Sequence, residues 1–296
     1  MSWIQIRIHA QRAQVNSVED TLLALGALSV TMQDDADQPI LEPELGTNPI
    51  WDNTQIIGLF DANQNSEELL QRLSQAYEQL SGDALPQHKL EILEDKDWVR
   101  AWMEDYHPMQ FGQRLWVCPS WQKPPQPDAV NLMLDPGLAF GTGTHPTTDL
   151  CLQFLDAEVE GDELVVDYGC GSGILGIAAL LLGARKMVGV DIDPQALTAT
   201  RDNAGRNQID ESLFDVYLPA STPAVEADIM VANILAGPLQ SLAPDIARLT
   251  RSGGKLALSG LLAEQAEEVA ACYSQWYDMQ PPKQLGDWVV LTGIKR

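Results

Sequence analysis

The stretch Val165–Gly176, VVDYGCGSGILG, decides the fold of this chain. It begins as an apolar strand and then places four glycines in the turn that opens a helix: Gly169, Gly171, Gly173 and Gly176. Glycine permits a tight turn and lets a ligand approach the backbone, and the first turn of a helix offers free N–H groups. The stretch therefore predicts a ligand of the nucleotide type at a strand-to-helix turn.

A second strand, in the stretch VGVDID, ends with Asp191, 22 residues after Gly169. An acid at this place accepts hydrogen bonds from the two hydroxyls of a ribose. NAD enzymes use the same geometry, so Gly169 and Asp191 indicate an adenosine-type nucleotide without specifying a reaction. The alternative is that Asp191 is a capping carboxylate ahead of Pro194.

Two features favour S-adenosyl-L-methionine over NAD. Asp167 precedes the glycines to give D-x-G-x-G-x-G, which resembles motif I of the class I S-adenosylmethionine-dependent methyltransferases. Asn233 ends the strand DIMVANIL, at the carboxyl edge where ligands bind in open α/β sheets. Members that methylate amines and amides carry Pro-Pro and an aromatic after this position, whereas this chain has Ile-Leu-Ala. The difference argues against a flat substrate clamped by the aromatic.

From about residue 145 onward, apolar strands alternate with helical patterns, which predicts a parallel sheet covered on both faces. The last two strands lie on either side of Gly286-Asp287, a hairpin signal. We therefore expect a Rossmann-like α/β fold of the class I methyltransferase type. Its seven-stranded, mostly parallel sheet ends in an antiparallel C-terminal hairpin.

Residues 1–95 show the order β-α-β-β-α-β of a small ferredoxin-like α+β domain. Its first strand contains Ile4, Ile6 and Ile8, and Ser66 is the expected cap of its second helix. Residues 96–107, KDWVRAWMEDYH, have the spacing of a helix and form the expected linker. Residues 108–296 then make the methyltransferase domain.

A further glycine-rich stretch, DPGLAFGTGTHPTT, covers Asp135–Thr148. Its glycines allow it to bend over the cofactor, with Thr148 offering a hydroxyl to the methionine end. Phe140 either lies near the sulfonium, where an aromatic face favours a cation, or plugs the core. His145 is either a general base or a hydrogen-bonded loop histidine.

The chain is strongly acidic. Its 18 Lys and Arg stand against 42 Asp and Glu, a net charge of −24, and residues 1–95 alone carry −12. Such a surface disfavours direct nucleic-acid binding and attracts a basic partner, although acidity also maintains solubility. No apolar run has the ~18 residues of a membrane span, and there is no signal-peptide pattern. Four scattered cysteines without C-x-x-C fit a reducing cytoplasm and no metal site.

Together, DPGLAFGTGTHPTT, VVDYGCGSGILGIAA, VGVDIDPQAL and ANILAGPL resemble the PrmA family, the methyltransferases of large-subunit ribosomal protein L-eleven. The resemblance covers essentially the whole chain. It implies an N-terminal substrate-recognition domain, a mobile linker and a catalytic domain that methylates lysine ε-amines and the N-terminal α-amine of the ribosomal protein. Carried over by position, cofactor contacts fall on Thr148, Gly169, Asp191 and Asn233, beside Gly171 in the same turn.

Methyl transfer to an amine requires the neutral form, and a free lysine with a pKa of ~10.4 is almost wholly protonated at neutral pH. We expect Asn233 to be the catalytic residue, because its amide oxygen can accept from the amine and align the lone pair. Two other functions fit the motifs: a methyltransferase of another protein or a small amine, and a non-catalytic regulator that binds S-adenosylmethionine or NAD.

Overall fold

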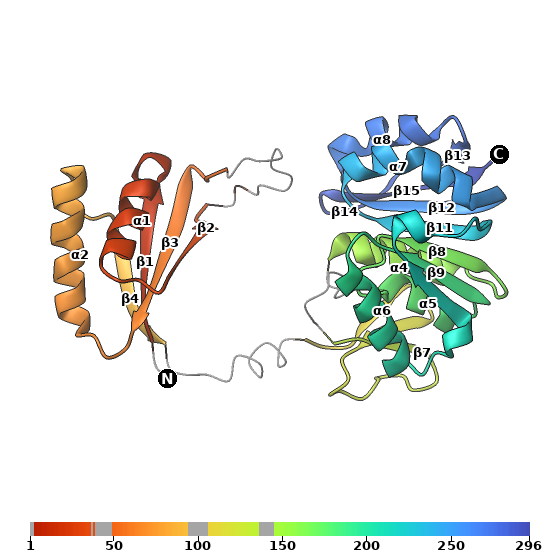
Figure 1. Cartoon of the computed structure of the whole chain (residues 1–296), viewed down its shortest axis with the longest axis horizontal. Coiled ribbons are helices and arrows are strands. Elements are labelled where there is room, and N and C mark those ends of the chain that lie inside the picture. The colour runs from red at the N-terminus through yellow and green to blue at the C-terminus, as the bar shows by residue number, and fades with distance from the viewer. Residues whose placement is uncertain (1–2, 37, 39–48, 94–105, 136–144) are drawn as a thin grey trace. The chain divides into compact units, whose positions relative to one another are not determined.

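The computed structural model describes residues 3–36, 38, 49–93, 106–135 and 145–296. The chain divides into two compact units, Met1–Glu104 and Asp105–Arg296 (Figure 1). Most of the expected linker helix at 96–107 lies outside the described residues. The two units are therefore considered one at a time.

The first unit has two helices on one face of a four-stranded antiparallel sheet (Figure 1). Its strand order is β2-β3-β1-β4, the arrangement of a ferredoxin-like domain, which confirms the predicted fold. The elements are β1 (Trp3–Gln11), α1 (Val15–Ala24), β2 (Ser29–Asp34), β3 (Asn53–Asp61), α2 (Ser66–Ser81) and β4 (His88–Leu93).

Alternation along β1 buries Ile4, Ile6 and Ile8 in the core of this unit. The expected cap of α2 is wrong by one residue. Asn65, with extended backbone angles, accepts hydrogen bonds through its side chain from the amides of Glu67 and Glu68 at 3.0 and 3.2 Å. Ser66 is already the first helical residue, so the cap lies one position earlier than expected.

The second unit is an α/β domain with a large sheet and a small one. Its elements are β5 (Met109–Phe111), β6 (Leu115–Cys118), β7 (Val130–Met133), α4 (Pro146–Glu158), β8 (Leu164–Tyr168), α5 (Ile174–Leu182), β9 (Lys186–Val190), α6 (Pro194–Arg206), β10 (Phe214–Tyr217), β11 (Ala227–Asn233), α7 (Ala236–Leu249), β12 (Thr250–Leu262), α8 (Ala266–Tyr273), β13 (Tyr277–Met279), β14 (Lys283–Leu285) and β15 (Trp288–Lys295).

Seven strands of the large sheet follow the order β10-β9-β8-β11-β12-β15-β13, and β14 pairs additionally with β15. The strands from β10 to β12 are parallel to their neighbours, whereas β15 is antiparallel to β12, β13 and β14. This confirms the class I methyltransferase fold with its antiparallel C-terminal end. The order of strands reverses between β8 and β11, so the carboxyl ends of these strands form the crevice where ligands bind in such sheets.

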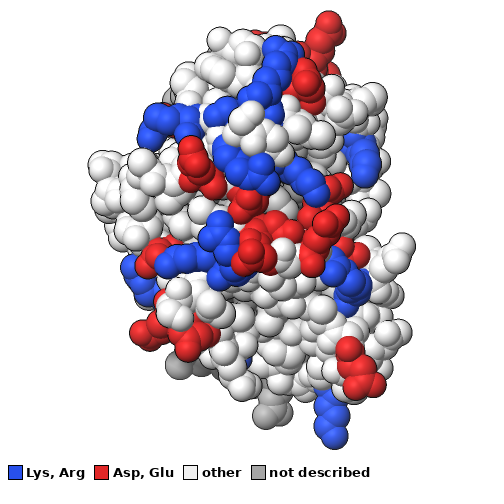
Figure 2. All heavy atoms as spheres, turned by 90° about the vertical axis from the view of Figure 1, so that its right-hand side faces the viewer, with Lys and Arg blue, Asp and Glu red and all other residues white. Residues whose placement is uncertain are grey.

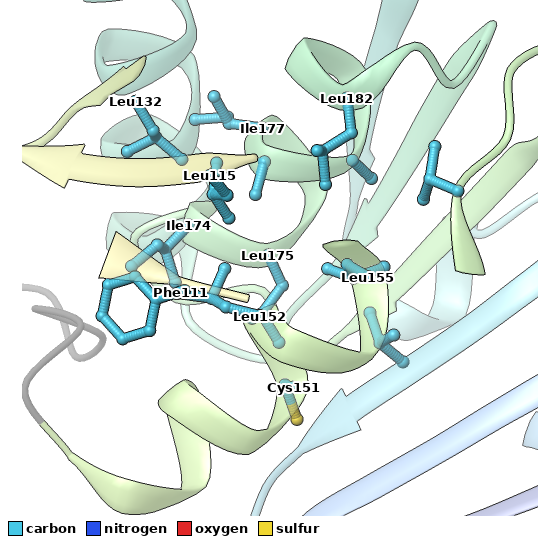
Figure 3. Packing of buried hydrophobic residues seen from close by; sticks show 14 of the residues in the cluster. Phe111, Leu115, Leu132, Cys151, Leu152, Leu155, Ile174, Leu175, Ile177 and Leu182 are labelled. Carbon is cyan, nitrogen blue, oxygen red and sulfur yellow. The ribbon is translucent and has the colours of Figure 1, made fainter. Parts of the chain in front are cut away.

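Helices cover both faces of the large sheet, with α4, α5 and α6 on one side and α7 and α8 on the other (Figure 1). The small sheet, in the order β5-β6-β7, packs against the first group. Figure 3 shows Phe111, Leu115 and Leu132 from this sheet beside Ile174 and Ile177 of α5. The packing fixes the start of α5, where the glycine-rich turn ends.

Several ion pairs lie at the edge of the large sheet where the parallel strands begin, opposite the edge formed by their carboxyl ends. Asp228 lies 3.3 Å from Arg185 and 2.6 Å from Arg251, and Lys255 lies 2.7 Å from Glu158. Figure 2 shows this side of the unit, with basic and acidic side chains intermingled. The charges at this edge therefore largely compensate one another. Among the described residues, no helix is long and apolar enough to cross a membrane.

Candidate active site

The turn between β8 and α5 requires its glycines. Gly169, Gly171 and Gly173 have φ values of +83°, +52° and +80°, which other residues rarely adopt. A Cβ on Gly169 would lie 2.3 Å from Cγ2 of Ile234, and one on Gly173 would lie 2.7 Å from Cγ2 of Thr200. Both the backbone conformation and the neighbouring side chains therefore exclude larger residues.

Two polar side chains of α6 hold this turn in place. Asn203 Nδ2 donates to the carbonyl of Ser172 at 2.8 Å, and Thr200 Oγ1 donates to the carbonyl of Gly171 at 3.1 Å. Both side chains are buried, and neither was predicted from the sequence as part of the site. The available signal was their spacing of three residues, which places two polar groups on one face of a helix beside the glycine-rich turn.

Asp191 connects the ends of β8 and β9. Its Oδ2 accepts from the amide of Gly171 at 2.9 Å, and its Oδ1 accepts from the amide of Asp193 at 3.0 Å. The carboxylate that caps α6 is Asp193, which accepts from the amide of Gln195 at 2.8 Å. The alternative interpretation of Asp191 as the cap ahead of Pro194 is therefore wrong.

Asn233 and Thr148 form the other half of the site. Asn233 Nδ2 lies 3.3 Å from Thr148 Oγ1, which joins the end of β11 to the first turn of α4. Within the described part of the chain, Asn233 Oδ1 accepts no hydrogen bond, so this acceptor is available to a substrate. Gly260 allows the backbone after Asn233 to approach closely, because a Cβ there would lie 2.3 Å from the carbonyl oxygen of Ile234.

His145 is the N-cap of α4. Its Nδ1 lies 2.8 Å from Thr147 Oγ1 and accepts from the amide of Thr147 at 3.4 Å. The centroid of its ring lies 4.7 Å from the ring centroid of Trp288, in an edge-on arrangement. Partial burial lowers the pKa of His145. Because Nδ1 serves as the helix cap, the hydrogen-bonded loop histidine describes His145 better than a general base does.

Asp167 is the most buried acid of the turn, with 1% of its surface exposed. Its Oδ2 accepts from the amide of Gly176 at 2.9 Å, whereas Oδ1 is buried and has no hydrogen-bond partner among the described residues. Burial raises the pKa of Asp167 to about 7; the hydrogen bond from Gly176 opposes this shift and the charge of Asp191 adds to it.

The structure brings the predicted residues together in two groups. Gly169, Gly171 and Asp191 lie at the ends of β8 and β9, and Thr148 and Asn233 meet between α4 and β11. Phe140 lies outside the described residues, together with the glycines of the loop that we expect to close over the cofactor. Ile192, which was not predicted as a site residue, is 83% exposed directly after Asp191 and offers an apolar surface beside the proposed ribose position.

These groups suit a cationic nucleoside better than a dinucleotide. Beside the turn, Asp191 provides a carboxylate with the position of a ribose acceptor. The amides of Gly169, Gly171 and Gly173 already donate to protein oxygens, so the turn offers few donors to a diphosphate. With the strand order of the large sheet, the site defines a class I S-adenosylmethionine-dependent methyltransferase.

Comparison with known proteins identifies the family. The family described as "Ribosomal protein L11 methyltransferase (PrmA)" matches residues 2–296, and the chain belongs to it. The sequence is 57% identical over 295 residues to the ribosomal protein L11 methyltransferase of Cellvibrio japonicus, covering 100% of this chain and 99% of that protein. It is 56% identical over 296 residues to that of Pseudomonas fluorescens strain Pf0-1, with 100% of both chains covered.

A solved structure shows the same relationship. The crystal structure of ribosomal protein L11 methylase from Lactobacillus delbrueckii subsp. bulgaricus matches with a TM-score of 0.57 and 30% sequence identity. The match covers 64% of this chain and 100% of that one. S-adenosylmethionine is accordingly the cofactor.

Proposed function

We propose that this chain transfers methyl groups from S-adenosylmethionine to ribosomal protein L11, on lysine ε-amines and on the N-terminal α-amine, in the cytoplasm. The observation that carries the proposal is the Asn233–Thr148 pair at the ligand edge of the sheet, which leaves the oxygen of an amide available for an amine. Membership of the L11 methyltransferase family supports the choice of protein substrate.

The two groups of the site have separate roles toward the cofactor in this proposal. Gly169 and Gly171 let it approach the backbone, and the carboxylate of Asp191 accepts from its ribose hydroxyls. Thr148 offers its hydroxyl to the methionine end of the cofactor, and Phe140 lies near the sulfonium. When bound, S-adenosylmethionine supplies an electrophilic methyl group on a positive sulfonium.

The protein then has to present a neutral, correctly oriented amine. Asn233 Oδ1 accepts a hydrogen bond from the amine, so that the lone pair points along the line of displacement. Thr148 fixes the Asn233 side chain through the 3.3 Å contact, which limits the rotamers open to it. Orientation of this kind is the main contribution that a protein makes to an in-line displacement.

Deprotonation of the amine does not require a dedicated base in this proposal. Desolvation in the pocket and the neighbouring positive sulfonium both lower the pKa of a lysine. His145, the histidine nearest in sequence to Thr148, uses Nδ1 to cap α4. Release of the proton to water before the amine enters is therefore the simplest route.

The N-terminal unit is the proposed substrate-recognition domain, with 96–107 as the linker to the methyltransferase domain at 108–296. Residues 1–95 carry half of the net charge of −24 in a third of the chain. Long-range attraction would bring a basic ribosomal protein to this unit and orient it on approach. Several methylated amines on one substrate also require more than one docking orientation, which a linker between two units can provide.

Mass spectrometry of purified ribosomal protein L11 after incubation with the enzyme and S-adenosylmethionine tests the proposal. We expect mass increments of whole methyl groups on lysines and on the N-terminus. If other ribosomal proteins or small amines are labelled while L11 is not, the substrate is wrong. If cofactor binds in calorimetry but no ribosomal protein is labelled, the chain acts as a sensor.

A further inference from the structure

One group in the site has no role in the proposed methyl transfer: the carboxyl of Asp167. It lies at the end of β8, directly before the glycine-rich turn, and is 1% exposed. One oxygen accepts from the amide of Gly176, and the other is buried with no partner in the described ranges of the chain. An ionised carboxylate with an unsatisfied buried oxygen is costly, whereas a protonated one is tolerated.

The groups around Asp167 do not compensate a negative charge. The acidic neighbour that acts on it electrostatically is Asp191 at the end of β9, and the charge of Asp167 in turn acts on the thiols of Cys151 on α4 and Cys170 in the turn. The two thiols are themselves neutral, because burial raises their pKa values. Among the described residues, no Lys, Arg or His forms an ion pair with Asp167.

A cation is therefore the missing partner, and the cofactor of this site carries one on its sulfonium. We propose that Asp167 is protonated in the free enzyme and gives up its proton to the solvent when S-adenosylmethionine binds. The carboxylate formed in this way compensates the positive charge. Asp167 thus acts as a specificity-determining residue that favours the charged cofactor over its neutral thioether product.

The physical reason is linkage between charge and protonation. A positive charge nearby stabilises the carboxylate and lowers its pKa, and by the same free energy the carboxylate strengthens binding of the cation. Methyl transfer removes the sulfonium charge, so the carboxylate loses its partner and takes up a proton again. The product, S-adenosylhomocysteine, is then held less tightly than the cofactor, which assists turnover.

Isothermal titration calorimetry of the full chain tests the proposal. Titrations in two buffers of different ionisation enthalpy give the number of protons released on binding. With a free-state pKa near 7, we expect release of roughly half a proton per S-adenosylmethionine at pH 7, and an association constant that rises about tenfold from pH 6 to pH 8. Binding of S-adenosylhomocysteine should release clearly fewer protons.

The matched variant is Asp167→Asn, which keeps a neutral acceptor for Gly176 and resembles the protonated carboxyl in shape. It should lose the proton release and the tenfold pH dependence, and bind S-adenosylmethionine more weakly with little change for the product. The amine of the ligand itself titrates in both experiments. The difference in proton release between the wild type and Asp167→Asn therefore gives the contribution of Asp167. Equal proton release in the two proteins would overturn the proposal.

Infrared difference spectroscopy provides a test that needs no variant. The free enzyme at pH 6 should show the band of a protonated carboxyl that disappears when S-adenosylmethionine is added. Absence of this change in the wild-type protein would also overturn the proposal. Neither the calorimetry nor the infrared measurement uses a protein substrate. A negative result in either would therefore leave the proposed substrate untouched.

Discussion

Asn233 Nδ2 lies 3.3 Å from Thr148 Oγ1, although 85 positions separate the two residues in the sequence. The contact joins the carboxyl end of a central strand to the first turn of α4, where the glycine-rich stretch Asp135–Thr148 ends. A single hydrogen bond therefore connects the proposed amine acceptor with the segment that we expect to close over the cofactor.

Asn233→Ala should reduce methylation at least tenfold, a loss of about 1.4 kcal/mol of transition-state stabilisation. The reason is that the amine loses the acceptor that orients its lone pair. Turnover is measured with saturating cofactor, and calorimetry checks that S-adenosylmethionine still binds. Thr148→Val, which removes only the hydroxyl that fixes Asn233, should cause a smaller loss. Unchanged turnover in Asn233→Ala would refute the assigned role.

Gly169→Ala should destabilise the protein by about 1–3 kcal/mol, because alanine is strained at a φ of +83° and meets Ile234. Cofactor affinity should fall with it. Gly205→Ala is the matched control, since its added methyl group meets nothing within 4 Å in α6 and should be neutral or slightly stabilising. Urea unfolding compares the two. Similar unfolding midpoints would show that the turn tolerates a side chain.

Lowering the pH should destabilise the first turn of α4, because His145 caps this helix. Its pKa is lowered by burial, so the unfolded chain binds a proton more readily than the folded one. The free energy of unfolding should therefore fall as pH decreases through the ordinary range of histidine, near ~6.5. His145→Asn keeps a capping side chain that does not titrate, and its stability should depend less on pH. Identical profiles for the two proteins would exclude the effect.

Asp167 should act on stability in the opposite direction. Its pKa is raised to about 7 by burial, so the folded chain holds a proton that the unfolded chain releases near ~4. Without cofactor, this group lowers the free energy of unfolding as pH rises from about 4 to about 7. Asp167→Asn should gain stability over the wild type across this range, as measured by thermal unfolding at several pH values. A constant difference between the two proteins would contradict the raised pKa.

Charge reversal at Glu78 tests the proposed recognition role of the N-terminal unit. Glu78→Lys lies in the last turn of α2, where a cation suits the helix dipole, so the fold should persist. Methylation of the proposed basic substrate should show a higher KM with kcat little changed, and the difference should shrink at high salt. Asp202→Lys, an exposed acid on α6, is the control with the same change in net charge. Equal effects of both variants would mean that overall charge alone matters.

Parts of the fold that depend on local pattern were predictable. Alternating isoleucines predicted β1, and apolar strands alternating with helices predicted the parallel sheet. The strands β5 and β10 were not predicted, because segments of three and four residues carry too little pattern of their own. They form because they pair with β6 and β9, whose positions are set elsewhere.

The sequence by itself determined the turn between β8 and α5, because glycine readily adopts the positive φ angles found at Gly169, Gly171 and Gly173. Only the tertiary structure decided the different structural roles of the acidic residues in the site. Asp191 and Asp193 are two residues apart, yet one bonds the glycine turn and the other caps α6. Burial likewise leaves one oxygen of Asp167 without a partner in the part of the chain that the structure describes. Such differences depend on the neighbours of each group in space, which residue spacing alone does not specify.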